Sequence, residues 1–289
     1  MRKLGPVLSA VFLLLPVLLG AQAFDYPYIP AKYKTPEQQL EYLSLHFWDN
    51  AKDAGGRALL AEEGVLEQAV VDFVSVVGAV PERTQRKAVR RFARTLARGE
   101  GLFGEAMEYV EKYLYGIDSP LRDDLLYGRF AERVGGAAGR DLREVVRKNL
   151  PGGPATDFAF LERGGRSGSL REACVGAEYL LLFFYDEDCD HCRAAIGTLR
   201  EDPFFEFCAA VGKMAVLGVD VTADPERWAA SGAQLPDFCT DARVADPDFF
   251  TGGKYLFREM PGIYLLDRSG TVLLKEVRLQ SVVEAVKSR

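Results

Sequence analysis

The stretch YLLLFFYDEDCDHCRAAIGTL, residues 179–199, passes from a continuous apolar run through an acidic loop into a helical pattern. The apolar run has no alternation of polar and apolar residues, which is typical of a central strand covered by helices on both faces. Two cysteines, Cys189 and Cys192, stand two residues apart where the loop meets the helical pattern. The chemistry open to this pair decides the functional interpretation.

The cysteine pair has three possible roles. A structural zinc site normally needs a second pair of ligands, and the only histidine outside the motif is His46, far upstream, so the sequence disfavours a metal site. A structural disulfide with a two-residue spacer would close a very small loop and constrain the unfolded chain little. A redox-active pair is therefore the favoured interpretation, and a structural disulfide stays the alternative.

The redox interpretation has a physical basis. A strand that ends near Asp186 brings Cys189 to the first turn of the next helix, where unpaired N–H groups and the helix dipole stabilise a thiolate. The thiolate is the form that attacks a disulfide, and Cys192, one turn further on, is placed to resolve the mixed disulfide. His191 would stabilise the thiolate. The acidic neighbours, which oppose a new negative charge, are Asp186, Glu187, Asp188 and Asp190.

The rest of the C-terminal half predicts a mixed α/β sheet. Strand-like runs cover 156–162, 179–186, 213–221, 262–270 and 271–277, and helical patterns cover 192–210, 224–231 and 280–288. The last two strand-like runs are joined by a short Arg-Ser-Gly turn and predict a hairpin, so the sheet contains antiparallel pairs. The first of these two runs follows Met260-Pro261, and proline is tolerated at the start of a strand.

This order of elements resembles the thioredoxin superfamily, specifically periplasmic thiol–disulfide oxidoreductases related to cytochrome-c-maturation and peroxiredoxin-like proteins. The segments that carry the resemblance are LLLFFYDEDCDHC, MAVLGVDV and REMPGIYLLDRSGTVLLKEV. It covers residues 155–289 and implies a thioredoxin fold, an α/β arrangement with a mixed central sheet and flanking helices. It also implies protein thiols and disulfides as substrates and a second thiol protein as electron donor or acceptor, with no bound cofactor.

The resemblance further implies roles for individual residues. Cys189 would be the attacking thiol and Cys192 the resolving thiol. The Met260-Pro261 bond would be cis and would lie beside the cysteines, with Pro261 as a wall of the site and the Met260 backbone pairing with an extended substrate segment. A paired thiol also disfavours a peroxidase.

The sequence departs from the family's pattern at several positions. The Trp-Cys-x-Pro-Cys motif is absent, because Asp188 replaces the tryptophan and Asp190-His191 form the spacer. Phe183 stands where thioredoxin carries a buried acid, six residues before the first cysteine. The group that deprotonates Cys192 is therefore not identified, and Glu187 or His191 could serve.

The N-terminal half predicts an all-α domain. Residues 35–150 show helical periodicity, and the first helix has a start signal in Thr35, Pro36 and Gln38. Proline and glycine cluster between Leu150 and Thr156, which places a helical domain at 24–152 and the thioredoxin-like domain at 153–289. IPAKYKTPEQQLEYLSLHFWDN, residues 29–50, resembles a helical domain of unknown function that precedes thioredoxin-like domains in exported bacterial proteins. We expect His46 and Trp48 in this segment to be core residues.

Residues 1–23 predict a signal peptide. A basic start, an apolar run and a small-residue Ala-Gln-Ala site favour cleavage after Ala23 and export to the periplasm, with no stable membrane insertion afterwards. Cleavage removes Arg2 and Lys3, so the formal net charge of the chain changes from −6 to −8. A chain with this negative charge has no electrostatic reason to bind nucleic acid. We expect the other cysteines to be buried and inert; they are Cys174, Cys208 and Cys239.

The sequence thus predicts an exported thiol–disulfide oxidoreductase that acts through Cys189 and Cys192. The alternative is a non-catalytic binding module, in which the helical domain recognises a partner and the cysteine pair is structural. The direction of electron flow stays open, because His191 is compatible with an oxidant or isomerase and the family resemblance with a reductant.

Overall fold

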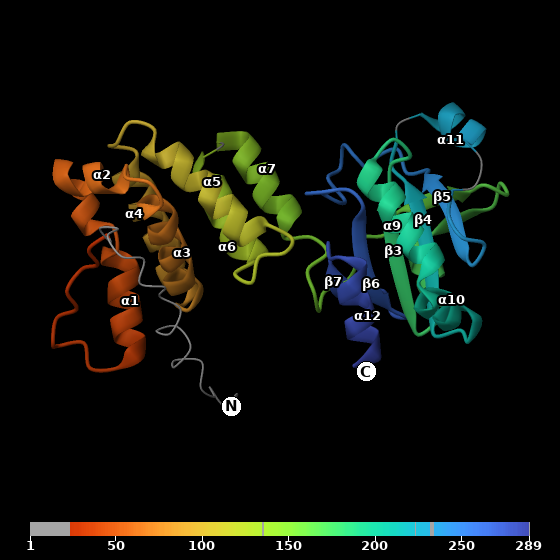
Figure 1. The fold of residues 1–289 in the computed structure, drawn as a ribbon, viewed down its shortest axis with the longest axis horizontal. Coiled ribbons are helices and arrows are strands. Elements are labelled where there is room, and N and C mark those ends of the chain that lie inside the picture. The colour runs from red at the N-terminus through yellow and green to blue at the C-terminus, as the bar shows by residue number, and fades with distance from the viewer. Residues whose placement is uncertain (1–23, 135, 223, 232–233, 289) are drawn as a thin grey trace. The chain divides into compact units, whose positions relative to one another are not determined.

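The structure, a computed structural model, describes residues 24–134, 136–222, 224–231 and 234–288 (Figure 1). The chain forms two compact units that divide between Tyr109 and Val110. The predicted signal peptide lies outside the described residues. Within those residues, no helix is both long and apolar enough to cross a membrane.

The first unit is helical, as predicted. Its elements are α1 (Pro36–His46), the 3-10 helix η2 (Asp49–Lys52), α2 (Ala54–Leu60), α3 (Val65–Gly78), α4 (Glu82–Leu96) and the start of α5 (Leu102–Tyr115). Thr35 caps α1 in a capping box with Gln38, with Pro36 in the first turn, which confirms the predicted start. Trp48 is buried among aromatic rings that include Phe73 and Phe92.

The expectation that His46 is a core residue is wrong. Its side chain is about one-third exposed, stacks on Tyr42 and pairs with Asp49 at 2.7 Å. His46 is the last residue of α1. It therefore reaches the acidic start of the following 3-10 helix instead of the core.

The second unit begins with helices and continues into a sheet. Its helices are the end of α5, α6 (Asp124–Val134), α7 (Gly136–Val146), α8 (Leu170–Cys174), α9 (Asp190–Glu201), α10 (Pro203–Ala210), α11 (Pro225–Ser231) and α12 (Leu279–Lys287). Its strands are β1 (Ala159–Glu162), β2 (Ser167–Ser169), β3 (Tyr179–Tyr185), β4 (Met214–Asp220), β5 (Cys239–Val244), β6 (Gly262–Asp267) and β7 (Val272–Lys275). The change from helices to strands occurs between α7 and β1, whereas the predicted domain boundary at 152/153 stays a prediction.

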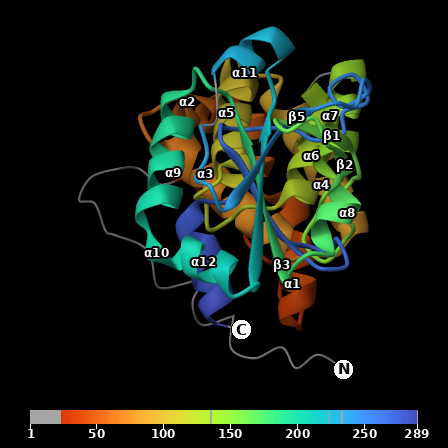
Figure 2. The same ribbon diagram turned by 90° about the vertical axis from the view of Figure 1, so that its right-hand side faces the viewer.

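The seven strands form one mixed sheet in the order β2-β1-β5-β4-β3-β6-β7. Strands β3, β4 and β5 run parallel, and β6 and β7 form the predicted antiparallel hairpin at one side. Helices α9, α10 and α12 lie on one side of the sheet and α8 lies on the other (Figure 2). This is the predicted α/β arrangement, with parallel strands in the middle.

Strand β3 explains why the apolar run lacks alternation. Tyr179, Leu181, Phe183 and Tyr185 enter the core under α9 and α12. The intervening Leu180, Leu182 and Phe184 enter the core on the opposite face. Every residue of β3 is buried, so a polar group on either face needs a hydrogen-bond partner inside the protein, as the Tyr185 hydroxyl has in Asp241. The strand therefore fixes the position of the loop that follows it.

Several elements differ from the sequence prediction. The predicted helix 192–210 is two helices, because Asp202 ends α9 and caps α10, with Pro203 at the first position of α10. Strand β5 was not predicted: its sequence CTDARV is polar and lacks apolar periodicity. The short β2 and α8 were also not predicted.

We predict that Phe183→Ala lowers the free energy of unfolding by about 3–5 kcal/mol, because it leaves a cavity beneath α9. Phe183 is fully buried, whereas Phe207 on α10 is 64% exposed. The matched change Phe207→Ala should cost about 0.5 kcal/mol or less. Chemical denaturation of both variants tests this, and equal losses would contradict the assignment of Phe183 to the core.

Candidate active site

Cys189 is the residue that caps the N-terminus of α9. Its sulfur accepts a hydrogen bond from the backbone N–H of Cys192 at 3.3 Å. The side chain is partly exposed. A sulfur in this position faces the unpaired amides and the positive end of the helix dipole, which favour a negative charge on it. The predicted location of Cys189 in the first turn is therefore correct to within one residue.

Cys192 lies one turn further on and is fully buried. Burial raises the pKa of its thiol to about 12, and the neighbouring Cys189 sulfur contributes in the same direction, while a hydrogen bond with the Asp186 backbone opposes the rise. It packs beneath α9 with Phe183 and Ile196. The two cysteines thus differ sharply. The Cys189 sulfur is partly exposed to solvent, whereas the Cys192 thiol is buried and stays protonated.

The peptide bond between Met260 and Pro261 is cis. The Cys189 thiol donates to the carbonyl oxygen of Met260 at 3.8 Å. Pro261 directly precedes β6, which pairs with β3, so two neighbouring strands bring the proline and the cysteines together. The structure therefore places four of the five residues named from the sequence around one sulfur atom.

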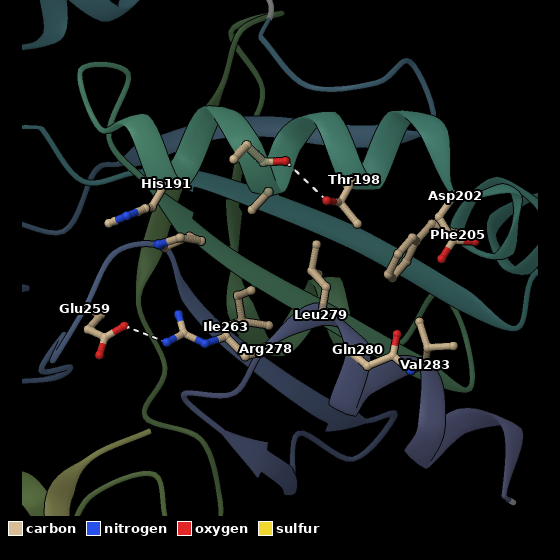
Figure 3. Close-up of a pocket in the computed structure, with 13 residues that line it drawn as sticks. His191, Thr198, Asp202, Phe205, Glu259, Ile263, Arg278, Leu279, Gln280 and Val283 are labelled. Carbon is tan, nitrogen blue, oxygen red and sulfur yellow. Dashed lines mark hydrogen bonds and ion pairs between the residues drawn. The ribbon is translucent and has the colours of Figure 1, made fainter. Parts of the chain in front are cut away.

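His191, the fifth, lines an exposed groove. The groove has a volume of about 470 Å³ and runs between α9 and α12, with Pro261 and Ile263 in its wall. In Figure 3, His191 stands at one end of the groove and Phe205 at the other, and the Glu259–Arg278 ion pair lies across the groove from α9.

The acidic loop before Cys189 is paired with arginines. Arg227 of α11 contacts Asp188 at 2.7 Å and Asp186 at 3.7 Å. Arg163, just after β1, contacts Glu187 at 3.4 Å. Asp190 forms an ion pair with Arg193 of its own helix. Local cations therefore offset the negative charges that were expected to oppose a thiolate.

Glu187 is one of the two groups that the sequence suggests for deprotonating Cys192. Its carboxylate is instead bound by Arg163 and by the Ser231 hydroxyl. Arg163 also binds Asp241 at 2.6 Å and lies over the ring of Trp228. This network ties the loop to α11 and β5 and holds Glu187 as an ion-pair partner.

A buried acid that the sequence analysis missed lies below the loop. Asp220 ends β4 opposite Tyr185, is 1% exposed, and has one carboxylate oxygen without a hydrogen-bond partner among the described residues. Burial raises the pKa of its carboxyl, as do Glu187 and Asp186, while hydrogen bonds from Thr222 oppose the rise. The sequence signal that could have indicated this buried acid is the apolar run of β4, which ends in Gly-Val-Asp.

The other cysteines are not bonded to one another. Cys174 and Cys208 are buried, as expected, whereas Cys239 is only partly buried. Burial raises the pKa of the Cys174 thiol to about 11 and that of Cys239 to about 12. Across the part of the chain that the structure describes, no three metal-ligating side chains are grouped so as to hold an ion.

Comparison with solved structures identifies the fold. A thioredoxin-like protein from Bacteroides caccae superposes with a TM-score of 0.71 at 26% sequence identity, covering 93% of this chain and 99% of that one. The chain belongs to the thioredoxin-like superfamily. Residues 7–145 also match a family described only as a domain of unknown function, DUF5106. No functionally curated protein matches the sequence.

Two further solved structures match the thioredoxin-like part alone. One is the thioredoxin domain of a thiol-disulfide oxidoreductase from Bacteroides vulgatus, with 21% identity, coverage of 48% and 96% of the two chains, and a TM-score of 0.42. The other is a putative thiol:disulfide interchange protein from Chlorobium tepidum, with 28% identity, coverage of 48% and 94%, and a TM-score of 0.39.

We predict that iodoacetamide at pH 8 modifies Cys189 of the reduced protein first. A thiol with a pKa of about 12, as for Cys192 and Cys239, is ionised in only about one molecule in ten thousand at this pH. Fragment-ion mass spectrometry locates the adducts over time. Cys239 is the internal control because it is also partly exposed, and alkylation of Cys239 as fast as Cys189 would contradict the geometry.

We also predict that Asp220→Asn becomes more stable relative to the wild type as the pH rises above about 4, the pKa of an unperturbed aspartate. The Asp220 pKa is higher in the folded state, so the wild type loses stability as the pH rises from the unfolded value through the folded value. Asparagine does not titrate. Denaturation at several pH values tests this, and a constant difference between the two proteins would contradict it.

Proposed function

We propose that the protein is a thiol–disulfide oxidoreductase whose Cys189 exchanges disulfides with protein thiols. The observation that carries the proposal is the position of the Cys189 sulfur: at the N-terminus of α9, partly exposed, and 3.8 Å from the Met260 carbonyl oxygen. The fold is shared with thiol–disulfide oxidoreductases, and the two sulfurs differ in exposure as a nucleophile and a resolving thiol should.

The exchange proceeds in two balanced steps. The Cys189 thiolate attacks one sulfur of a substrate disulfide, so the substrate S–S bond breaks, a mixed disulfide forms, and the first substrate thiolate leaves and takes a proton from water. Cys192 then gives its proton to water and attacks the Cys189 sulfur, so the S–S bond of the mixed disulfide breaks, the Cys189–Cys192 disulfide forms, and the second substrate thiolate leaves and takes a proton from water. The substrate gains two electrons and the protein loses two, and a second thiol protein restores the dithiol.

In this proposal the backbone of Met260 pairs with an extended segment of the substrate, and Pro261 forms the wall beside the mixed disulfide. His191 and Pro261 both line the groove, and in this proposal the substrate segment leaves the site along it. The proposal includes cleavage of residues 1–23 and residence in the periplasm, with a helical domain at 24–152 and the catalytic domain at 153–289.

We predict that catalytic amounts of the protein accelerate the reduction of insulin by dithiothreitol, and that Cys189→Ser lowers the rate to that of dithiothreitol alone. Cys239→Ser is the matched control, because it makes the same chemical change at another partly exposed thiol, and it should keep the wild-type rate. Equal rates for the wild type and Cys189→Ser would favour the alternative, a binding module with a structural cysteine pair.

A further inference from the structure

We propose that the helical segment 110–150 positions the loop that carries Met260, and that Asp124 of α6 is its central positioning residue. The inference rests on the proposed function, because it assigns the loop a role in holding the substrate. In this proposal helices α5 to α7 hold a loop of the thioredoxin-like site in place, although they supply no reacting group to it.

The first observation is a buried charge cluster. Asp124 contacts Lys275 of β7 at 2.8 Å and Arg258 at 2.6 Å, and all three side chains are 7% exposed or less. Burial alone would raise the pKa of Asp124, but Lys275 and Arg258 outweigh it, so the pKa lies below its ordinary value and the carboxylate stays charged. Glu276, 2% exposed, is the second anion of the cluster and contacts Arg258 at 3.4 Å.

The second observation connects this cluster to the active-site loop. The backbone N–H of Arg258 donates to Glu276 at 3.0 Å, and the Arg258 guanidinium lies over the ring of Tyr115 at 3.6 Å. Arg258 is two residues before Met260, whose carbonyl oxygen faces the Cys189 sulfur. The side chain and the backbone of Arg258 are therefore both fixed immediately before the cis bond.

The third observation is that the same helical segment holds the start of this loop. Lys148 donates to the carbonyl oxygens of Gly252 and Gly253 at 3.1 and 2.9 Å. The side-chain amide of Asn149 donates to the carbonyl oxygen of Lys254 at 2.9 Å. Residues 252–258 contain no regular secondary structure, so contacts of this kind replace a strand ladder in fixing the path of the chain.

The energetic consequence follows from the charges. Arg122, whose side chain is 17% exposed, also contacts Asp124 at 3.3 Å and Glu276 at 4.0 Å. Without the carboxylate of Asp124, the two buried cations Lys275 and Arg258 would therefore share Glu276 as their buried anion with the more exposed Arg122. A buried charge without a partner costs free energy, and this cost falls when the charged side chain moves toward water. The side chain on the less constrained part of the chain moves most easily. Lys275 belongs to a strand, whereas Arg258 belongs to the loop. The loop is therefore the part that shifts, and Met260 shifts with it.

The decisive variant is Asp124→Asn, which keeps the shape of the side chain and removes its charge. With an insulin-derived disulfide peptide as substrate, we expect KM to rise about five- to tenfold, the effect of one or two weakened backbone hydrogen bonds, while kcat stays within about twofold. A merely destabilising change would lower kcat and the melting temperature together without this split.

Glu132→Gln is the matched control. Glu132 is on the same helix but pairs with Arg143 of α7 at 3.3 Å, so its loss should leave KM unchanged. If Asp124→Asn does not fold, Tyr115→Leu removes the ring beneath Arg258 without changing the buried charge and should raise KM in the same way. An unchanged KM in folded Asp124→Asn, or an equal rise in Glu132→Gln, would overturn the proposal.

Hydrogen exchange separates this proposal from the proposed function. Backbone amides of residues 254–263 should exchange faster in Asp124→Asn than in the wild type and Glu132→Gln, whether or not the wild type reduces disulfides. Faster exchange in a protein without disulfide activity would refute the function and keep the positioning role. Unchanged exchange in that segment would refute the positioning role alone.

Discussion

The burial of β3 on both faces is the constraint on which the site depends. Because each side chain of the strand fills one of two cores, the strand has one register and one depth in the sheet. The chain leaves it at Tyr185 and reaches the start of α9 at Asp190. That short connection delivers the Cys189 sulfur to the helix N-terminus, and pairing of β3 with β6 brings Met260-Pro261 to the same place.

Two groups of ion pairs surround the site, one near the surface and one buried. At the surface, arginines of α11 and of the segment after β1 pair with the acids that precede Cys189. These contacts are partly exposed, so each contributes modestly to stability, yet together they keep the loop from presenting a bare negative charge beside the sulfur. Deeper in the molecule, the buried cluster around Asp124 joins the preceding helices to the loop before Pro261.

Local sequence signals predicted the parts of the fold that depend on local physics. The apolar β3, the Cys189 turn, the hairpin of β6 and β7 and the cap at Thr35 were all evident from spacing and residue type. Strand β5 was not, because its residues are polar and only its neighbours β4 and β1 define it as a strand. Contacts between distant segments were also inaccessible. Arg163 with Glu187 and Asp124 with Arg258 depend on how the sheet brings those segments together.

In the proposed function, Cys189 is the residue whose sulfur bonds to the substrate. Trapping tests it most directly: Cys192→Ser removes the resolving thiol, so a mixed disulfide with an insulin-derived disulfide peptide should accumulate and survive without reductant. We expect one peptide adduct per chain, located by mass spectrometry on Cys189. No adduct, or an adduct on Cys239 instead, would contradict it.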